Sequence, residues 1–180
     1  KIGSIMYKKE LTSISKQANI PIDKLILMQI IYEMCACCTS VVIPIQTGND
    51  PGYNLHFRTM DWEMDFLRDL TINVEFYKKG RLLFKGVTWA GYVGIVTGMN
   101  ESYSIAINYR RSNGTIMGNM MRTLRMKWPI GYLTRHIYEQ DLWFSDAREM
   151  LQFSPLIAPC YITLCASTAK IGNSVVLVRD

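Results

Sequence analysis

A cysteine at the start of a predicted strand is the residue of this sequence best placed to do chemistry. Cys38 stands in the stretch MCACCTS, and the apolar run VVIPI follows directly. If the Cys37–Cys38 peptide bond were cut, the free amine of Cys38 could serve as the base for its own thiol, because an α-amine titrates close to neutral pH. A nucleophile of this kind needs no histidine, and the sequence offers only two, His56 and His136.

Two charged residues on the next predicted strand could complete such a site. Arg58 and Asp61 lie in LHFRTMD, and pairing of this segment with CTSVV as a hairpin would bring its end close to Cys38. A guanidinium beside a thiol favours the thiolate, and a carboxylate can orient an ammonium group through charge-assisted hydrogen bonds. On the residues alone, an ordinary surface pair of Arg58 and Asp61 beside a buried cysteine remains open.

The five cysteines admit other roles as well. Cys35 and Cys38 have the CxxC spacing of half a zinc site, but Cys160 and Cys165 are spaced too widely to resemble the other half. We therefore predict no metal and no cofactor. A disulfide between Cys160 and one of the early cysteines remains open, and the odd count leaves at least one thiol free or paired outside this chain in a secretory protein.

The segments around these residues predict the elements that must position them. Helical patterns cover residues 1–36, with Pro21 near a helix start, and Pro129 opens a later helix. Alternating or β-branched runs predict strands, and KKG between two of them predicts a hairpin turn. The predicted strands are CTSVVIPI, LHFRTMDW, TINVEFY, RLLFKGV, YSIAINY, CYITLCA and SVVLV, and the later helices are GNMMRTLRMKW, IGYLTRHIYEQ and SDAREMLQF, the last capped by Ser145. This order favours an α+β fold with an antiparallel sheet.

Composition narrows the classes of partner. Hydrophobic residues make up 49% of the 180 residues, which is enough for one domain with a sizeable core, yet no apolar stretch is long enough to span a bilayer. The net charge of +5 is spread over short clusters such as those in YKKE and NYRR. This spread argues against nucleic-acid binding and fits attraction to an anionic membrane surface.

Two sequons and the ends of the sequence favour the secretory route. Asn100 in NES and Asn113 in NGT are candidate glycosylation sites. The sequence starts at Lys1 without an initiator Met and stops directly after the strand-like SVVLVRD. We therefore expect a processed product or a piece of a longer precursor, with further sequence after Asp180, in a secreted or lysosomal protein.

Several segments resemble the acid ceramidase family and its relative, N-acylethanolamine acid amidase. They are CTSVV, RTMDW, FKGVTWAGYVGIVTGMN, SIAINYRRS, WPIGYLTRHIYEQ and LIAPCYI, and the resemblance runs from about Ile31 to Asp180. It implies an N-terminal nucleophile hydrolase of the cholylglycine hydrolase type, with a four-layer αββα sandwich of antiparallel sheets. The precursor of such an enzyme cuts itself before the cysteine. Residues 1–37 would then end the first chain, and residues 38–180 would form the catalytic chain, with its C-terminal part incomplete.

The resemblance also assigns roles to residues. Cys38 matches the nucleophile, and Arg58 and Asp61 match the arginine and aspartate that the family carries on the next strand. Arg179 matches a basic position at the end of a strand. Asn108 falls in a stretch expected to help bind the substrate or its oxyanion.

Three departures from the family pattern bear on activity. Asn108 is followed by Tyr109, where the family has an acidic residue. Ser167, in CAS, stands where the family has an asparagine of the oxyanion hole. Loss of one such donor costs about 3 kcal/mol of transition-state stabilisation. The family's region beyond Asp180 is also absent from the sequence.

The implied reaction is hydrolysis of the amide bond of an N-acylated sphingoid base, which converts ceramide into sphingosine and a fatty acid. An N-acylethanolamine amidase and a catalytically impaired lipid-binding homologue are the alternatives. The implied partners are the N-acyl lipid, the other processed chain, and an anionic membrane surface or a lipid-presenting activator, with no nucleic acid. We expect LILMQIIYEM, WAGYVGIV and GTIMGNMMRTLRM to line a channel for the lipid tail, although such stripes also suit an ordinary helix core.

Overall fold

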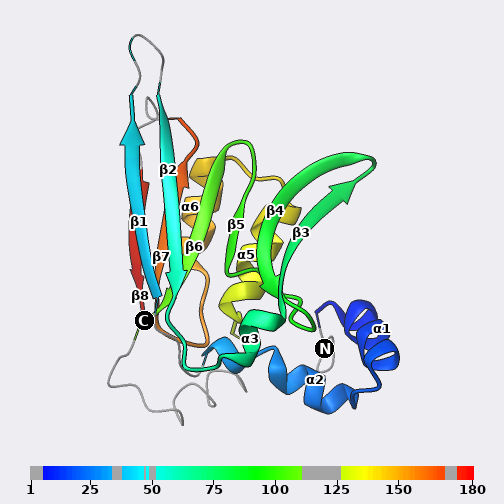
Figure 1. The fold of residues 1–180 in the computed structure, drawn as a ribbon. Coiled ribbons are helices and arrows are strands. Elements are labelled where there is room, and N and C mark those ends of the chain that lie inside the picture. The colour runs from blue at the N-terminus through cyan, green and yellow to red at the C-terminus, as the bar shows by residue number, and fades with distance from the viewer. Residues whose placement is uncertain (1–5, 34–37, 47, 49–51, 111–126, 169–173) are drawn as a thin grey trace.

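Two antiparallel sheets and a set of helices make up the computed structural model, which describes residues 6–33, 38–46, 48, 52–110, 127–168 and 174–180 (Figure 1). The smaller sheet is the hairpin of β1 (Cys38–Ile45) and β2 (Tyr53–Met60). The larger sheet holds six strands in chain order, β3 (Thr71–Lys78), β4 (Arg81–Trp89), β5 (Thr97–Met99), β6 (Tyr103–Tyr109), β7 (Cys160–Ala166) and β8 (Ser174–Arg179). Every neighbouring pair is antiparallel, which confirms the predicted α+β class.

The described residues form three layers of the expected sandwich. Helices α5 (Ile130–Glu139) and α6 (Phe144–Phe153) cover one face of the six-stranded sheet, and the hairpin β1–β2 lies over β6 and β7 on the other face (Figure 1). The outer face of the hairpin carries exposed apolar side chains such as Val41, Ile43 and Phe57, with exposed fractions of 46%, 42% and 51%. Within this part of the chain, no helix covers that outer face.

The period of two along the strands decides which side chains face which layer. On β6, Ile105 and Ile107 are fully buried toward the helices, whereas Ser104 and Asn108 face the hairpin. This confirms the alternation predicted for YSIAINY. The hairpin alternates in the same way, so its half-buried residues face the six-stranded sheet and its exposed residues face away.

The turn between β3 and β4 follows from two residues. Lys79 and Gly80 have φ angles of +51° and +79°, and two positive φ angles are what a two-residue type I′ hairpin turn requires. The hairpin predicted at KKG is therefore confirmed. The helix predicted at SDAREMLQF begins one residue earlier, at Phe144, so Ser145 lies in the first turn and its side chain does not cap the helix. The helix predicted for GNMMRTLRMKW falls mostly outside the described residues.

The segment before Cys38 packs against the rest of the fold rather than standing apart. It contains α1 (Lys8–Ala18), α2 (Ile22–Met28) and a short 3-10 helix, η1 (Ile31–Glu33), whereas a further short helix, α3 (Phe66–Asp69), lies between β2 and β3 in the chain. Leu11 and Leu25 are fully buried against Val93 and Tyr132. In the described part of the chain, no helix is both long and apolar enough to cross a membrane.

A buried arginine ties this segment to α5. Arg135 is 4% exposed, and its guanidinium contacts the carboxylates of Glu10 at 2.6 Å and Glu139 at 2.8 Å. The ring of Tyr7 lies 4.0 Å from the same guanidinium. Removal of one partner of a buried charge is costly, because the charge is left uncompensated. Loss of either carboxylate would therefore weaken the packing of α1 against α5.

Candidate active site

Cys38 is the first residue of β1, is half-buried, and faces the six-stranded sheet. Its sulfur accepts a hydrogen bond from Nη2 of Arg58 at 3.0 Å. The hairpin register explains this contact, because Arg58 pairs with Ser40 and therefore points to the same inner face as Cys38. The predicted approach of Arg58 to Cys38 is present, and a guanidinium at this distance can stabilise a thiolate.

The guanidinium is held by groups other than the thiol. Nε and Nη2 of Arg58 donate to the carbonyl oxygen of Ile107 at 3.1 and 2.7 Å. Nη2 also donates to the hydroxyl of Tyr32 at 3.1 Å. That hydroxyl donates to the same Ile107 carbonyl at 2.6 Å and lies 3.8 Å from the sulfur of Cys38. The guanidinium, the tyrosine hydroxyl, the backbone carbonyl and the thiol therefore hold one another in place at the start of β1.

Tyr32 is a site residue that the sequence did not reveal. It lies in η1, six positions before Cys38, and only 1% of its surface is exposed. Burial raises the pKa of Tyr32 far above its usual value, so the hydroxyl keeps its proton and remains a donor. The only signal was its place in an apolar helical stripe, and that stripe is equally typical of core packing.

Asp61 follows β2 and is exposed to solvent. Its carboxylate accepts a hydrogen bond from the hydroxyl of Thr59 at 3.4 Å, and the structure shows no contact between it and Cys38. The predicted role of Asp61 is to orient an ammonium group on Cys38, and such a group exists only after cleavage before this residue. The role of Asp61 therefore stays a prediction for the cleaved protein.

The remaining predicted residues lie at different places. The carboxamide of Asn108 hydrogen-bonds with the Ser40 hydroxyl at 3.1 Å in either orientation of the amide, which puts it beside the thiol site. Tyr109 packs on the helix side of the sheet. Arg179 also points to that side, where its Nη2 donates to the Ser154 carbonyl at 2.6 Å. The structure therefore brings only Asn108, of these three, toward Cys38.

Ser167 lies at the opposite end of the hairpin from the thiol. Its carbonyl accepts a hydrogen bond from the backbone N–H of Asn54, and Asn54 pairs with Pro44. Pro44 is six strand residues from Cys38, which corresponds to about 20 Å. In this structure the hydroxyl of Ser167 is therefore too distant to donate to an oxyanion formed at the sulfur.

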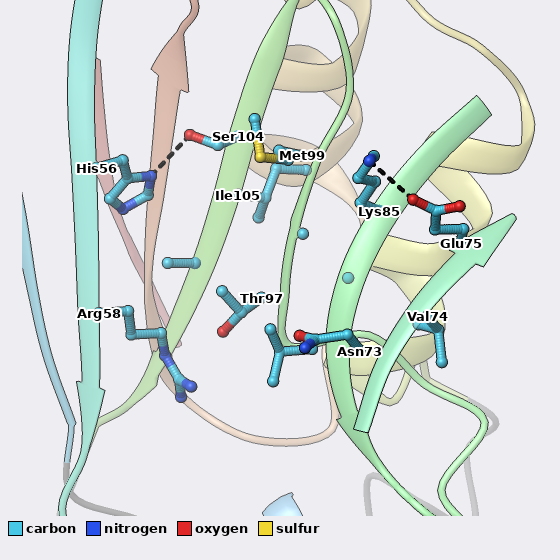
Figure 2. Close-up of a pocket in the computed structure, with 14 residues that line it drawn as sticks. His56, Arg58, Asn73, Val74, Glu75, Lys85, Thr97, Met99, Ser104 and Ile105 are labelled. Carbon is cyan, nitrogen blue, oxygen red and sulfur yellow. Dashed lines mark hydrogen bonds and ion pairs between the residues drawn. The ribbon is translucent and has the colours of Figure 1, made fainter. Parts of the chain in front are cut away.

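A cavity of about 480 Å³ begins at Arg58 and extends over the face of the six-stranded sheet between β2 and β3 (Figure 2). Figure 2 shows Arg58 and His56 reaching toward this space from β2, with the ion pair of Lys85 and Glu75 on its far side. Its lining mixes apolar side chains with a few polar ones. The segments that we expected to line a lipid channel do not line this cavity, or fall partly outside the described residues.

His56 supplies a neutral polar group to the cavity wall. Its Nδ1 lies 2.8 Å from the hydroxyl of Ser104. Burial, with the positive charge of Arg58 in second place, lowers the pKa of His56 below its usual value. An imidazole in this position therefore resists protonation and can exchange hydrogen bonds with a hydroxyl group.

A second thiol lies on the helix side of the sheet. Cys160 is 2% exposed, and burial, followed by the nearby Glu33 carboxyl, raises the pKa of Cys160 far above its usual value. Glu33 is itself 2% exposed and accepts a hydrogen bond from the backbone N–H of Ile130 at 2.7 Å. Burial raises the pKa of Glu33 to about 8.

The described residues bear on metal, disulfide and glycosylation sites as well. No group of three or more His, Cys, Asp or Glu side chains gathers there in a way that could hold a metal ion. Cys38, Cys160 and Cys165 are free thiols, whereas Cys35 and Cys37 lie outside the described residues. The carboxamide oxygen of Asn100 accepts hydrogen bonds from the backbone of the next turn. Asn113 lies outside the described residues.

The sequence is similar to those of known proteins over almost its whole length. No protein-family model matches the sequence. An uncharacterized protein of Acanthamoeba polyphaga mimivirus is 36% identical over 98% of this chain and 56% of its own length. The acid ceramidase of Balaenoptera acutorostrata scammoni is 32% identical, and that of Homo sapiens 30%, each over 97% of this chain and 47% of the relative. The chain thus spans about half the length of the curated relatives it matches.

A solved structure agrees with these relatives. The Caenorhabditis elegans ortholog of N-acylethanolamine-hydrolyzing acid amidase superposes with a TM-score of 0.65 and 27% identity, covering 80% of this chain and 60% of the other. The similarity therefore extends from sequence to fold, and the fold carries the cysteine and arginine of the predicted motifs on facing strands. In sequence and in fold, this chain is therefore similar to acid ceramidase and to N-acylethanolamine-hydrolyzing acid amidase over most of its length.

Proposed function

We propose that this chain carries the nucleophile of a lipid amide hydrolase, with Cys38 as the attacking thiol. The observation that supports this most is the contact of 3.0 Å between the sulfur of Cys38 and Nη2 of Arg58, next to a cavity that begins at the same arginine. The names of the relatives, acid ceramidase and N-acylethanolamine-hydrolyzing acid amidase, support an N-acyl lipid as the substrate. Ceramide is the substrate we favour, and an N-acylethanolamine is the alternative.

The first step is self-cleavage. The thiol of Cys38 adds to the carbonyl carbon of Cys37, the amide C–N bond breaks, and the nitrogen of Cys38 takes up the proton as it becomes an amine. Water then hydrolyses the thioester, which gives a carboxylate on Cys37 and restores the thiol. The contact of Arg58 with the sulfur supports this step, because it would hold the attacking group in place.

Turnover then uses the new chain end. The amine of Cys38 accepts the thiol proton, and the thiolate attacks the amide carbon of the lipid. The amine returns a proton to the leaving nitrogen, the acyl group stays on sulfur as a thioester, and water releases the fatty acid. Arg58 stabilises the thiolate, and Asp61, one residue beyond the strand partner of Cys38, orients the amine.

The oxyanion of this reaction needs donors other than Ser167. Asn108 lies beside Ser40 and can turn its amide group toward the site, together with backbone N–H groups. The distance of Ser167 from the thiol, and a tyrosine at position 109, favour a weak enzyme over a highly active one. They also keep a catalytically impaired lipid-binding homologue as the second candidate.

The cavity offers room for part of the lipid. Its volume of about 480 Å³ falls within the range of ordinary ligand sites, and its mixed lining suits an apolar chain with a few polar groups. The net charge of +5 supports delivery from an anionic membrane surface or a lipid-presenting activator. We also propose a lysosomal or secreted location, and the sequons at Asn100 and Asn113 support it as candidate glycosylation sites.

The test is to incubate the full chain at mildly acidic pH with a panel of fluorogenic N-acyl amides and to follow chain cleavage on a gel. We expect a cut before Cys38 and release of the fluorophore. The Cys38→Ala variant should show neither, and Cys165→Ala, which removes a buried thiol near the other end of the sheet, should show both. A chain that binds N-acyl lipids but is never cleaved and never hydrolyses them would favour the impaired homologue.

A further inference from the structure

Three hydrogen bonds converge on the carbonyl oxygen of Ile107. Two come from Nε and Nη2 of Arg58, at 3.1 and 2.7 Å, and the third comes from the hydroxyl of Tyr32 at 2.6 Å. The oxygen of Tyr32 in turn accepts a hydrogen bond from Nη2 of Arg58 at 3.1 Å. The backbone carbonyl and the tyrosine thus form a triangle with the guanidinium and fix its plane beside the thiol.

The ring of Tyr32 can hold this position firmly. It is 1% exposed and packs edge-on against Trp62, with 6.2 Å between ring centroids, and at a tilt against Trp89, with 6.3 Å. Because its hydroxyl stays protonated, it donates to the Ile107 carbonyl and leaves its oxygen free to accept from Arg58. The direction of both hydrogen bonds is therefore fixed.

The backbone around Tyr32 is anchored independently of its link to Cys38. The next residue, Glu33, binds the N–H of Ile130 at the start of α5. Upstream, the amide of Gln29 donates to the Gly91 carbonyl at 2.8 Å and accepts from the backbone of Val93 at 2.9 Å. A cut before Cys38 would break none of these contacts.

From this geometry we infer that Tyr32 is a positioning residue, which holds Arg58 against the thiol of Cys38 from a segment that precedes the cleavage site. The inference rests on the proposed function in one respect: after cleavage the site is composed of two chains, and the shorter chain supplies Tyr32. The segment before the cut is then a lasting part of the site and not a removable cover.

The test compares Tyr32→Phe with the control Tyr103→Phe in the full chain. Tyr103 is equally buried but lies at the other end of β6, against Tyr138 and Phe144. The readout is the rate at which limiting iodoacetamide alkylates Cys38, located by peptide mass spectrometry over a range of pH. We expect Tyr32→Phe to slow this alkylation about tenfold at acidic pH, the size expected for one hydrogen bond to a charged group, and Tyr103→Phe to leave it unchanged.

A double-mutant cycle separates positioning from a general structural role. In an Arg58→Lys background, where the guanidinium plane is gone, Tyr32→Phe should have little further effect on alkylation. Equal losses in both backgrounds, or wild-type alkylation in Tyr32→Phe, would overturn the inference. Unfolding of Tyr32→Phe but not of Tyr103→Phe would also overturn it, because the hydroxyl would then serve the fold.

This readout requires neither chain cleavage nor lipid hydrolysis, so it can succeed or fail independently of the proposed function. If cleavage does occur, native mass spectrometry tests the two-chain site. We expect the fragment with Tyr32 to remain bound in every active particle. Hydrolysis by particles that have lost this fragment would contradict a lasting role.

Discussion

The two faces of the six-stranded sheet differ in what they bury. On the helix face, Ile105, Ile107 and Leu164 have no exposed surface, and an aromatic stack continues the packing from Phe84 to Tyr138 with ring centroids 4.9 Å apart. On the hairpin face, Ser104 and Asn108 bond to polar groups, and a cavity of about 480 Å³ remains open. Successive residues of β6 thus alternate between the hydrophobic core on the helix face and the candidate site on the hairpin face.

Two thiols near one end of the six-stranded sheet, those of Cys160 and Cys38, differ in the same way. Cys160, on the helix face, lies among apolar groups and close to a carboxyl, and burial raises its pKa far above the usual value. Cys38 is half-buried and contacts a guanidinium at 3.0 Å. Access and a positive partner, rather than the presence of a thiol, therefore decide which cysteine can be a nucleophile.

The largest effect should separate the two thiols. Cys38→Ala should reduce both chain cleavage and amide hydrolysis to background, because no other described thiol faces the hairpin side beside a cation. Cys160→Ala should keep both activities and lose only about 1 kcal/mol of unfolding free energy through lost packing. Gel analysis and a fluorogenic assay check the first expectation, and urea unfolding checks the second. Equal loss of activity in both variants would contradict the proposed difference in function between the two thiols.

The next effect concerns the stability of the two faces. Leu164→Ala should lower the free energy of unfolding by about 2–5 kcal/mol, because it leaves a cavity in a fully buried position. Met99→Ala, at a cavity-lining residue that is 55% exposed, should cost less than about 1 kcal/mol and should instead weaken lipid binding. Urea unfolding of both variants measures the difference. A similar cost at the two positions would mean that the hairpin face is packed like a core.

The third effect concerns the charge beside Cys38. Arg58→Ala should lower the rate of amide hydrolysis about 10²-fold, since one preorganised charged donor is lost from the site. Arg81→Ala is the control, because Arg81 forms an exposed pair with Asp141 far from the thiol. Steady-state rates of amide hydrolysis by both variants test this prediction. A wild-type rate in Arg58→Ala would show that the arginine takes no part in the reaction.

The smallest effect is a dependence of stability on pH that originates at Glu33. The pKa of Glu33 is raised from 4.5 to about 8 in the folded protein, so the folded state keeps a proton that the unfolded state loses above pH 4.5. The stabilising contribution of this group is therefore complete below pH 4.5 and declines as the pH rises toward 8. Between pH 5 and 7 the decline should be about 2 kcal/mol.

Glu33→Gln checks this assignment, because glutamine keeps an oxygen for the N–H of Ile130 but has no proton to lose. Urea unfolding at both pH values should show a flatter pH dependence in the variant than in the wild type. Parallel curves would place the pH dependence at other groups.

Local rules made part of this site predictable. The period of two in LHFRTMDW and an antiparallel partner starting at Cys38 are enough to put Arg58 on the thiol side. The positions of Tyr32, Arg179 and Ser167 depend instead on how layers stack and on which face each strand end presents. These contacts join segments that are distant in sequence, and the residues themselves carry no periodic signal for them.

Competitive labelling tests the central claim most directly, because all thiols of the full chain then compete in one sample. Limiting iodoacetamide is added at mildly acidic pH, and fragment spectra assign the label to individual cysteines. Among the described cysteines, we predict that Cys38 is labelled at least about tenfold faster than the buried Cys160 and Cys165, and that Arg58→Ala lowers the rate at Cys38 about tenfold without changing the rates at the other two. Labelling of Cys38 no faster than the two buried cysteines, or an unchanged rate at Cys38 in Arg58→Ala, would contradict this claim.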